Sequence, residues 1–254
     1  MHFFIFAYNI IILLYKYKKL ENKNIKSEVF DFLKDLIIIW IIVILIRTFL
    51  AEPFQISGQS MADSYYDKEF IIVDRFSYLD IPGIKEWEIK RGDVIVFKPW
   101  VSEDKEYFIK RIIGLGWDTI KIKNWKVYLK KKWETEFKEL NEKYLNKENQ
   151  NHTKVWSDTW EKVFKVPENK FFAMWDNRNH SSDSRTCFSF SCNSSSRDSF
   201  ITKDEIIWKV FLDLWYFNFR NFSFVNPGSS SYPDTKGLDT TPRWFDSPSS
   251  FKYE

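Results

Sequence analysis

Two apolar runs stand at the start of the chain, ahead of a long stretch in which apolar and polar residues alternate. Residues 36–46, LIIIWIIVILI, are apolar without a break, and Arg47 and the string TFLA follow them. A bilayer span needs about 20 predominantly apolar residues, with about 17 as a lower limit. We therefore predict a transmembrane helix over 36–51 that borrows flanking residues, with the Arg47 side chain extended to the interface. The earlier run, 3–15, is open between a first span, a start-site artefact and the core of a signal peptide.

The segment between the two runs, residues 16–35, is rich in lysine. It carries Lys16, Lys18, Lys19, Lys23, Lys26 and Lys34. Because loops rich in lysine and arginine stay on the cytoplasmic side of a membrane, we predict that this loop is cytoplasmic. Residues 1–51 would then form a membrane anchor, and the large polar region after them would lie outside the cytoplasm.

Short runs of β-branched and aromatic residues dominate residues 54–128, and turn signals separate them. The runs are FIIVDRF, DVIVFKP, YFIKRIIGL and TIKIKNWKVYL, and similar ones return at KFFAM and EIIWKVFLDLWYF. This pattern predicts a mainly β domain over 52–220, built as an antiparallel sheet or barrel. Residues 130–165 are rich in Lys, Glu and Asn, and we expect a polar, solvent-exposed insertion there. The Ser/Pro-rich tail, 221–254, is expected to be disordered.

Composition adds one anomaly, because the chain has only 7 glycines beside 12 tryptophans. Glycine makes up about 7% of an average protein, or roughly 18 residues at this length. Trp125 stands between two strand-like runs where Asn-Gly, and not Asn-Trp, is the strong hairpin signal. The tryptophans at such turn positions are Trp117, Trp125, Trp133 and Trp175. Our hypothesis is that a reassigned UGA codon encodes glycine there and has been translated conceptually as tryptophan.

The alternative is a tryptophan-rich protein from a skewed genome, and the residues alone leave both interpretations open. Trp40 and Trp215 lie in apolar contexts, so we expect them to be tryptophan under either interpretation.

Charge and the scarcity of metal-binding residues narrow the range of functions. A net charge of +3 gives no basic footprint for a nucleic acid. The histidines are His2, His152 and His180, so a Ser-His-Asp triad would depend on His180. Two cysteines without a cluster at ligand spacing argue against a zinc site.

A serine and a lysine remain as candidates for catalysis. Ser60 lies in the turn-like string SGQSM, soon after the predicted membrane helix, and Lys110 interrupts an apolar strand. Burial among apolar neighbours would lower the pKa of Lys110 until the neutral amine could act as a base. A serine hydroxyl needs such a base to become a nucleophile, and Ser/Lys pairs work in this way. The alternative from the residues alone is a lysine on the solvent face of its strand.

Four blocks of sequence favour the catalytic interpretation. They are FLAEPFQISGQSM, RGDVIVFKP, FIKRIIGLGWD and MWDNRNHSSDSR, in this order after the predicted anchor, and they extend over most of residues 47–215. Together they resemble type I signal peptidase, a serine peptidase family with a Ser/Lys dyad. The resemblance implies an antiparallel β-sheet or barrel catalytic domain preceded by one or two transmembrane helices. At the positions of Trp117, Trp175 and Trp208 the family has glycine.

The resemblance implies roles for individual residues. Ser60 resembles the nucleophile, Lys110 the general base, and Ser181 the serine that hydrogen-bonds the lysine amine and fixes its direction. Met61 resembles the residue that lines the substrate pocket. The residues that match the supporting part of the family site are Arg111, Asp176, Asn177, Arg178, Asp183 and Arg185.

Two departures from the family pattern concern the oxyanion hole and the turn after the nucleophile. Many members have a serine two positions before the nucleophile, whose hydroxyl helps to bind the oxyanion, and this chain has Gly58 there. The oxyanion hole is then expected to use the Ser60 N–H and a weaker second donor, for which Ser57 is a candidate. Where the family usually has Pro-Thr shortly after Met61, this chain has ADS at residues 62–64.

Cys187 and Cys192 flank the string FSFS directly after the last of these blocks. Outside the cytoplasm such a pair can close a short disulfide loop, and two free thiols are the open alternative.

The function that the resemblance implies is removal of signal peptides from secreted preproteins by a membrane-bound serine endopeptidase. The expected location is the bacterial cytoplasmic membrane, with the catalytic domain on the extracytoplasmic side. The expected partners are preproteins with an Ala-X-Ala-like cleavage site and the lipid bilayer, with no nucleic acid, metal or cofactor. Two alternatives are open: a dedicated Ser/Lys peptidase for a pilin or conjugation substrate, and a catalytically inactive, membrane-anchored binding module with the same fold.

Overall fold

The computed structural model describes one helix near the start of the chain and most of the β-rich part. The described residues are 25–45, 51–58, 60–61, 64–74, 88–98, 107–155, 160–179, 182–189, 192, 198–218, 221 and 223–225. The chain divides into two compact units, Met1–Thr48 and Phe49–Glu254. The early apolar run at 3–15 and most of the tail after residue 221 lie outside the described residues.

The first unit contains one described helix, α2 (Ile25–Leu45). Glu28 lies in its first turn, where a negative side chain interacts favourably with the positive end of the helix dipole. Among the residues that the structure describes, no helix combines the length and the apolar character needed to cross a membrane. The predicted boundaries, 36–51, are wrong at both ends, because the helix begins at Ile25 and Ala51 pairs with Asp74 as part of a strand.

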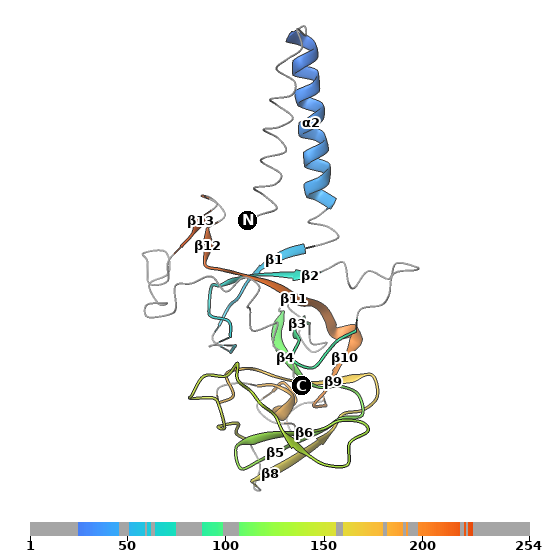
Figure 1. The fold of residues 1–254 in the computed structure, drawn as a ribbon, viewed down its shortest axis with the longest axis vertical. Helices are drawn as coiled ribbons and strands as arrows, with labels where there is room; N and C mark the ends of the chain where they lie inside the picture. The colour runs from blue at the N-terminus through green and yellow to red at the C-terminus, as the bar shows by residue number, and fades with distance from the viewer. Residues whose placement is uncertain are drawn as a thin grey trace. The chain divides into compact units, whose positions relative to one another are not determined.

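The second unit is mainly β, as predicted, and its largest element is a seven-stranded antiparallel sheet (Figure 1). In spatial order the strands are β1 (Ala51–Gln55), β2 (Phe70–Asp74), β11 (Ile206–Trp215), β3 (Val94–Phe97), β4 (Phe108–Gly114), β9 (Lys170–Met174) and β10 (Ile201–Thr202). Inside the sheet, β4 pairs with β3 on one side and with β9 on the other. Its residues from Lys110 to Gly114 are all buried, so this strand is covered on both faces.

A smaller antiparallel sheet has four strands, in the order β7 (Lys138–Glu139), β6 (Lys126–Lys130), β5 (Thr119–Lys123) and β8 (Glu161–Lys165). Buried residues alternate along β5 and β6, so one face of this sheet packs inward. On that face Ile120 and Leu129 share a hydrophobic cluster with Phe172 and Met174 of β9. The cluster therefore joins the two sheets.

The remaining described elements are short. They are the hairpin of β12 (Phe217–Asn218) with β13 (Ser223–Phe224) and the 3-10 helices η3 (Ser184–Thr186) and η5 (Lys203–Glu205). Because β13 pairs with β12, the expectation of a disordered tail from residue 221 is wrong for residues 223–224.

The insertion at 130–165 differs from the solvent-exposed segment that its composition predicts. It supplies β7 and β8 to the smaller sheet. Among the residues that the structure describes between these strands, the nearly or fully buried ones are Glu142, Leu145, Asn149 and Thr153. Buried polar side chains need hydrogen-bond partners, and the three polar ones meet Arg178, in the segment after β9. The prediction of an exposed segment is therefore wrong for these residues.

The hairpin between β5 and β6 bears on the glycine hypothesis. Its two-residue loop is Asn124 and Trp125, with φ of 49° and 68°, and Lys123 pairs with Lys126 across it. A loop of this kind needs positive φ at both positions, which is why Asn-Gly is preferred there. Trp117, in the turn before β5, has φ of 74°. Side chains with a Cβ are strained at these angles, so glycine suits both tryptophan positions better.

The other tryptophans give a different result. Within the described residues, Trp133, Trp175 and Trp208 have no left-handed φ, whereas the buried Trp215 has a φ of 61°. Backbone geometry therefore supports the hypothesis at Trp117 and Trp125 only. Trp215, which we expect to be a tryptophan, adopts such an angle as well, so a left-handed φ alone does not identify a glycine position.

Candidate active site

Lys110 is completely buried in β4. Aromatic rings surround its amine: Nζ lies 3.7 Å from the ring centroid of Trp175, 5.0 Å from that of Phe108 and 5.6 Å from that of Phe97. The amine also donates a 3.4 Å hydrogen bond to the Ile109 carbonyl. The alternative of a lysine on the solvent face of its strand is therefore wrong. Removal from water disfavours a charged amine, which is the condition that a lysine base needs.

Ser60 lies in the turn that follows β1 and is half-buried. The next residue, Met61, is completely buried, and its carbonyl accepts hydrogen bonds from the N–H groups of Ser64 at 3.0 Å and Tyr65 at 2.7 Å. Gly58 has a φ of 98°, and no atom lies within 4 Å of the place where a Cβ would stand. The backbone angle, and not crowding, is thus what favours glycine at this position.

The segment that follows β9 contacts both candidates. The Trp175 ring covers the Lys110 amine, and the Asn177 N–H donates to the Ser60 carbonyl at 3.0 Å. Between these two contacts, the Asp176 N–H donates to the Met61 sulfur at 3.4 Å. Three consecutive residues therefore bring the serine and the lysine, which are far apart in the sequence, to one place in the fold.

A buried ion pair ties the same segment to β4. Arg111, next to Lys110, lies 2.8 Å from Asp176 (Nη2 to Oδ2), and both side chains are completely buried. Arg111 also donates from Nη1 to the Gly92 carbonyl at 2.8 Å. Removing one partner of a buried ion pair typically costs about 3–5 kcal/mol, because the other charge is left without compensation.

A second buried ion pair, between Asp183 and Arg185, supports the segment from another side. Asp183 accepts hydrogen bonds from Arg185 Nε at 2.9 Å and Nη2 at 2.8 Å, and from the Trp175 N–H at 3.3 Å. The remaining guanidinium nitrogen of Arg185 donates to the Arg178 carbonyl at 2.9 Å. The pair thus binds the segment after β9 at the Trp175 N–H and at the Arg178 carbonyl.

Comparison with known proteins places this arrangement in a family. A family model described as signal peptidase, peptidase S26, matches residues 29–215. The chain belongs to this family.

Several signal peptidases are similar to the chain. Signal peptidase I P of Bacillus subtilis subsp. natto is 35% identical over 166 residues, which are 65% of this chain and 83% of the relative. Signal peptidase I S of Bacillus subtilis (strain 168) is 33% identical over 168 residues, 66% of this chain and 84% of the relative. A crystal structure of a signal peptidase I from Enterococcus faecalis V583 matches 49% of this chain and 98% of its own, at 22% identity and a TM-score of 0.35. The family predicted from the four blocks is confirmed, and the protein is a peptidase.

Most of the signal peptidase residues expected from the sequence meet in the structure. Those in contact with the segment after β9, or part of it, are Ser60, Met61, Lys110, Arg111, Asp176, Asn177, Arg178, Asp183 and Arg185. Ser181, the expected lysine-orienting residue, and His180 lie outside the described residues. Over the described ranges, no cluster of His, Cys, Asp and Glu could hold a metal ion.

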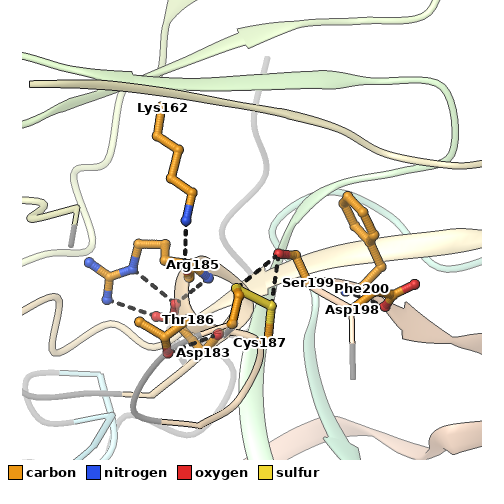
Figure 2. The surroundings of a disulfide bond; sticks show 9 residues. Lys162, Asp183, Arg185, Thr186, Cys187, Asp198, Ser199 and Phe200 are labelled. Carbon is orange, nitrogen blue, oxygen red and sulfur yellow. Dashed lines mark hydrogen bonds and ion pairs between the residues drawn. A yellow bond between two sulfur atoms is a disulfide. The ribbon is translucent and has the colours of Figure 1, made fainter. Parts of the chain in front are cut away.

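Cys187 and Cys192 form a disulfide, which decides between the two alternatives left open by the sequence (Figure 2). The bond follows directly on η3, the short helix that carries Arg185. Ser199 lies beside it, with Oγ 3.4 Å from the Cys187 sulfur. On the other side of η3, Lys162 of β8 donates to the Arg185 carbonyl at 3.2 Å, and partial burial lowers the pKa of the Lys162 amine. The loop that contains η3 is therefore held by a disulfide and by a hydrogen bond from the smaller sheet.

The partners of Arg178 could not be found from the sequence pattern. Its Nη2 atom donates to Glu142 Oε1 and to the Tyr144 hydroxyl, both at 2.7 Å, and its N–H donates to Asn149 at 2.8 Å. All three partners come from the insertion, in turns between β7 and β8 where no alternation or motif spacing marks them. The one usable signal is that an arginine in a buried segment requires a carboxylate from elsewhere in the chain.

Proposed function

We propose that the chain removes signal peptides from secretory preproteins by acyl transfer, with Ser60 as nucleophile and neutral Lys110 as general base. The observation that carries the proposal is the complete burial of Lys110, beside the segment whose Asn177 N–H binds the Ser60 carbonyl. A serine hydroxyl is a weak nucleophile until a base within hydrogen-bond reach takes its proton. A fully hydrated lysine stays charged near neutral pH, so burial is the feature that this role requires.

The proposed reaction has two halves. In the first, the Lys110 amine takes the Ser60 Oγ proton, and Oγ attacks the scissile carbonyl carbon. The carbon–nitrogen bond then breaks, the Lys110 ammonium returns a proton to the leaving amine, and an ester to Ser60 remains. In the second half, Lys110 takes a proton from water, the hydroxide attacks the ester, and the proton returns to Ser60 Oγ as the bond breaks.

Stabilisation of the oxyanion needs donors aimed at the carbonyl oxygen as its charge develops. The Gly58 N–H donates to Asp67 Oδ1 at 2.7 Å, so it is already engaged. Ser57 is exposed and its hydroxyl is the second donor that we propose, beside the Ser60 N–H. We also propose that the Ala-X-Ala region of the substrate binds as an extended strand at β1, which stands at one end of the sheet order and leads directly to Ser60.

We further propose that the N-terminal part of the chain anchors the peptidase domain to the extracytoplasmic face of the cytoplasmic membrane. The support is local: the last ten residues of α2, Leu36–Leu45, are apolar, and most of the large apolar side chains described on α2 are exposed. Exposed apolar side chains on one helix suit a lipid environment better than water.

A catalytically inactive binding module remains the second candidate, because one specific contact favours it. The Trp175 ring lies 3.7 Å from the Lys110 amine and occupies one side of it. The Trp175 indole Nε1 is buried and has no hydrogen-bond acceptor among the described residues, so the indole is poorly accommodated. An aromatic ring in this position would hinder the approach of a hydroxyl to the amine.

Covalent labelling separates the two candidates. The chain is incubated with a penem-type acylating inhibitor, and the mass of the intact protein is measured for the wild type, Ser60→Ala and Lys110→Met. The peptidase proposal predicts one adduct on the wild type, none on Ser60→Ala, and at least a hundredfold slower labelling of Lys110→Met, since general-base catalysis contributes about 10²–10⁴-fold. Absence of an adduct on the folded wild type would favour the binding module.

A further inference from the structure

The insertion reaches the active-site region through one aromatic residue, Tyr144. We propose that Tyr144 is a positioning residue, which holds the strand of the base and the segment that fixes the nucleophile turn in a constant relation. This inference depends on the proposed function for its catalytic consequence.

Tyr144 belongs to a closed triangle of hydrogen bonds with Glu142 and Arg178. Arg178 Nη2 donates to Glu142 Oε1 and to the Tyr144 hydroxyl, both at 2.7 Å, and the Tyr144 hydroxyl donates to Glu142 Oε1 at 3.0 Å. Arg178 is completely buried and Glu142 is 6% exposed. Charge-assisted bonds in a site removed from water are stronger and more directional than exposed ones. The triangle therefore fixes the Arg178 side chain in one position.

The ring of Tyr144 makes a second contact, with Arg111. The Arg111 guanidinium carbon lies 4.0 Å from the ring centroid. A planar guanidinium packs favourably against an aromatic face, and here the same guanidinium pairs with Asp176 at 2.8 Å. The Tyr144 side chain thus contacts both Arg111, which follows Lys110, and Arg178, which follows Asn177.

Both contacts lead to the catalytic candidates by short paths. Arg111 is the neighbour of Lys110 in β4, so the contact of Tyr144 with Arg111 connects the insertion to the strand that carries the base. Arg178 follows Asn177, whose N–H donates to the Ser60 carbonyl at 3.0 Å. Because this hydrogen bond joins the neighbour of Arg178 directly to Ser60, a shift of Arg178 moves the Ser60 turn relative to Lys110. Serine and lysine must come within about 2.6–3.2 Å for proton transfer, so small shifts reduce the rate.

The test uses the full chain and compares Tyr144→Phe with Tyr128→Phe. Tyr144→Phe keeps the ring on Arg111 and removes the hydroxyl from the triangle. Tyr128 lies on β6, where its ring contacts Lys121, and it provides a matched change away from the site. Cleavage of a preprotein is measured per Ser60 labelled by the acylating inhibitor, so that unfolded molecules do not count. Hydrogen exchange of the Asn177 amide is followed in the same samples.

For Tyr144→Phe we expect kcat to fall about fivefold, the loss of one hydrogen bond in a network, with KM within about twofold of the wild type. Glu142→Gln should give a similar loss, and the double variant should lose less than the product of the two, since the changes affect one network. The Asn177 amide should exchange faster in both single variants. Tyr128→Phe, and Lys143→Ala at an exposed neighbouring position, should match the wild type in all three measurements.

Unchanged kcat per labelled Ser60 in Tyr144→Phe would overturn the inference, as would an equal loss in Tyr128→Phe. Failure of the proposed function looks different, since the wild type itself would then not cleave. In that case the Asn177 amide decides: faster exchange in Tyr144→Phe but not in Tyr128→Phe supports the positioning role, and equal exchange in Tyr144→Phe and the wild type overturns it.

Discussion

Lys110 stands in the middle of a sheet strand, whereas Ser60 stands in a turn that other parts of the chain must hold in place. On the base side, β4 pairs with β3 and β9, and Lys110 is in register with Ile95. On the nucleophile side, the turn accepts single hydrogen bonds from the Asp176 and Asn177 N–H groups of the segment after β9. Backbone pairing over a whole strand fixes a position more firmly than two bonds do. We therefore expect changes in the segment after β9 to affect Ser60 more than Lys110.

The largest effect on stability is expected for the buried ion pair that joins the two sides. Asp176→Ala leaves Arg111 buried without its carboxylate, which should lower the free energy of unfolding by about 3–5 kcal/mol. The exposed pair of Lys126 and Glu139 supplies the control, since Glu139→Ala removes a solvent-screened pair and should cost far less. Urea unfolding of both variants measures the difference. Equal losses would mean that burial of the pair has no energetic consequence.

The disulfide beside the supporting loop should have the next largest effect. For a loop of this size, loss of the bond between Cys187 and Cys192 should cost about 2 kcal/mol, because the unfolded chain gains freedom. The double variant Cys187→Ser/Cys192→Ser is compared with the oxidised wild type by urea unfolding. Reduced wild type should behave like the variant. A loss in the variant without any loss on reduction would assign the effect to the serines instead.

The next prediction concerns Trp175. Its ring lies against the Lys110 amine, and its backbone belongs to the segment that contacts the Ser60 turn. Trp175→Gly removes the ring that lies 3.7 Å from the Lys110 amine, and we expect acylation of Ser60 to become about tenfold faster, a gain of about 1.4 kcal/mol in transition-state stabilisation. Trp175→Phe keeps an aromatic ring there and should give a much smaller gain. Labelling rates per folded molecule measure both. Slower labelling of Trp175→Gly would show that the indole supports the site.

The smallest expected effect concerns the turns of the smaller sheet, away from both candidates. Trp117→Gly and Trp125→Gly should each stabilise the chain by about 1 kcal/mol, since left-handed angles strain residues with a Cβ by about 1–2 kcal/mol. Trp133 is 86% exposed and has no left-handed φ, so Trp133→Gly serves as the control and should bring no gain. Mass spectrometry of the natural protein completes the test. Tryptophan found at positions 117 and 125 would contradict the codon hypothesis.

The sequence was sufficient for the mainly β fold and for the family, because strand alternation and the order of four blocks are both local signals. It also identified Lys110 as a lysine in an apolar strand, although only the structure shows that β4 is covered on both faces. The disulfide needed the fold, since cysteine spacing alone is equally compatible with free thiols.

The supporting role of the insertion could not be predicted. Glu142 and Tyr144 lie in turns, and a Lys/Glu/Asn-rich composition is typical of solvated segments. Their packing results from Arg178, a partner distant in the sequence, and hydrophobic periodicity carries no signal of such a pairing. The helix boundary failed for a related reason, since the pairing of Ala51 with β2 outweighs its place in an apolar run.

The most direct test of the account is cleavage of an Ala-X-Ala preprotein in detergent by the full chain and by Lys110→Met, which has a side chain of similar length without the amine. Both proteins are first shown to be folded by circular dichroism and to carry the disulfide. We predict a cut after the Ala-X-Ala site by the wild type and a rate at least about a hundredfold lower for Lys110→Met. Equal cleavage by the two proteins would contradict the assignment of Lys110 as the general base.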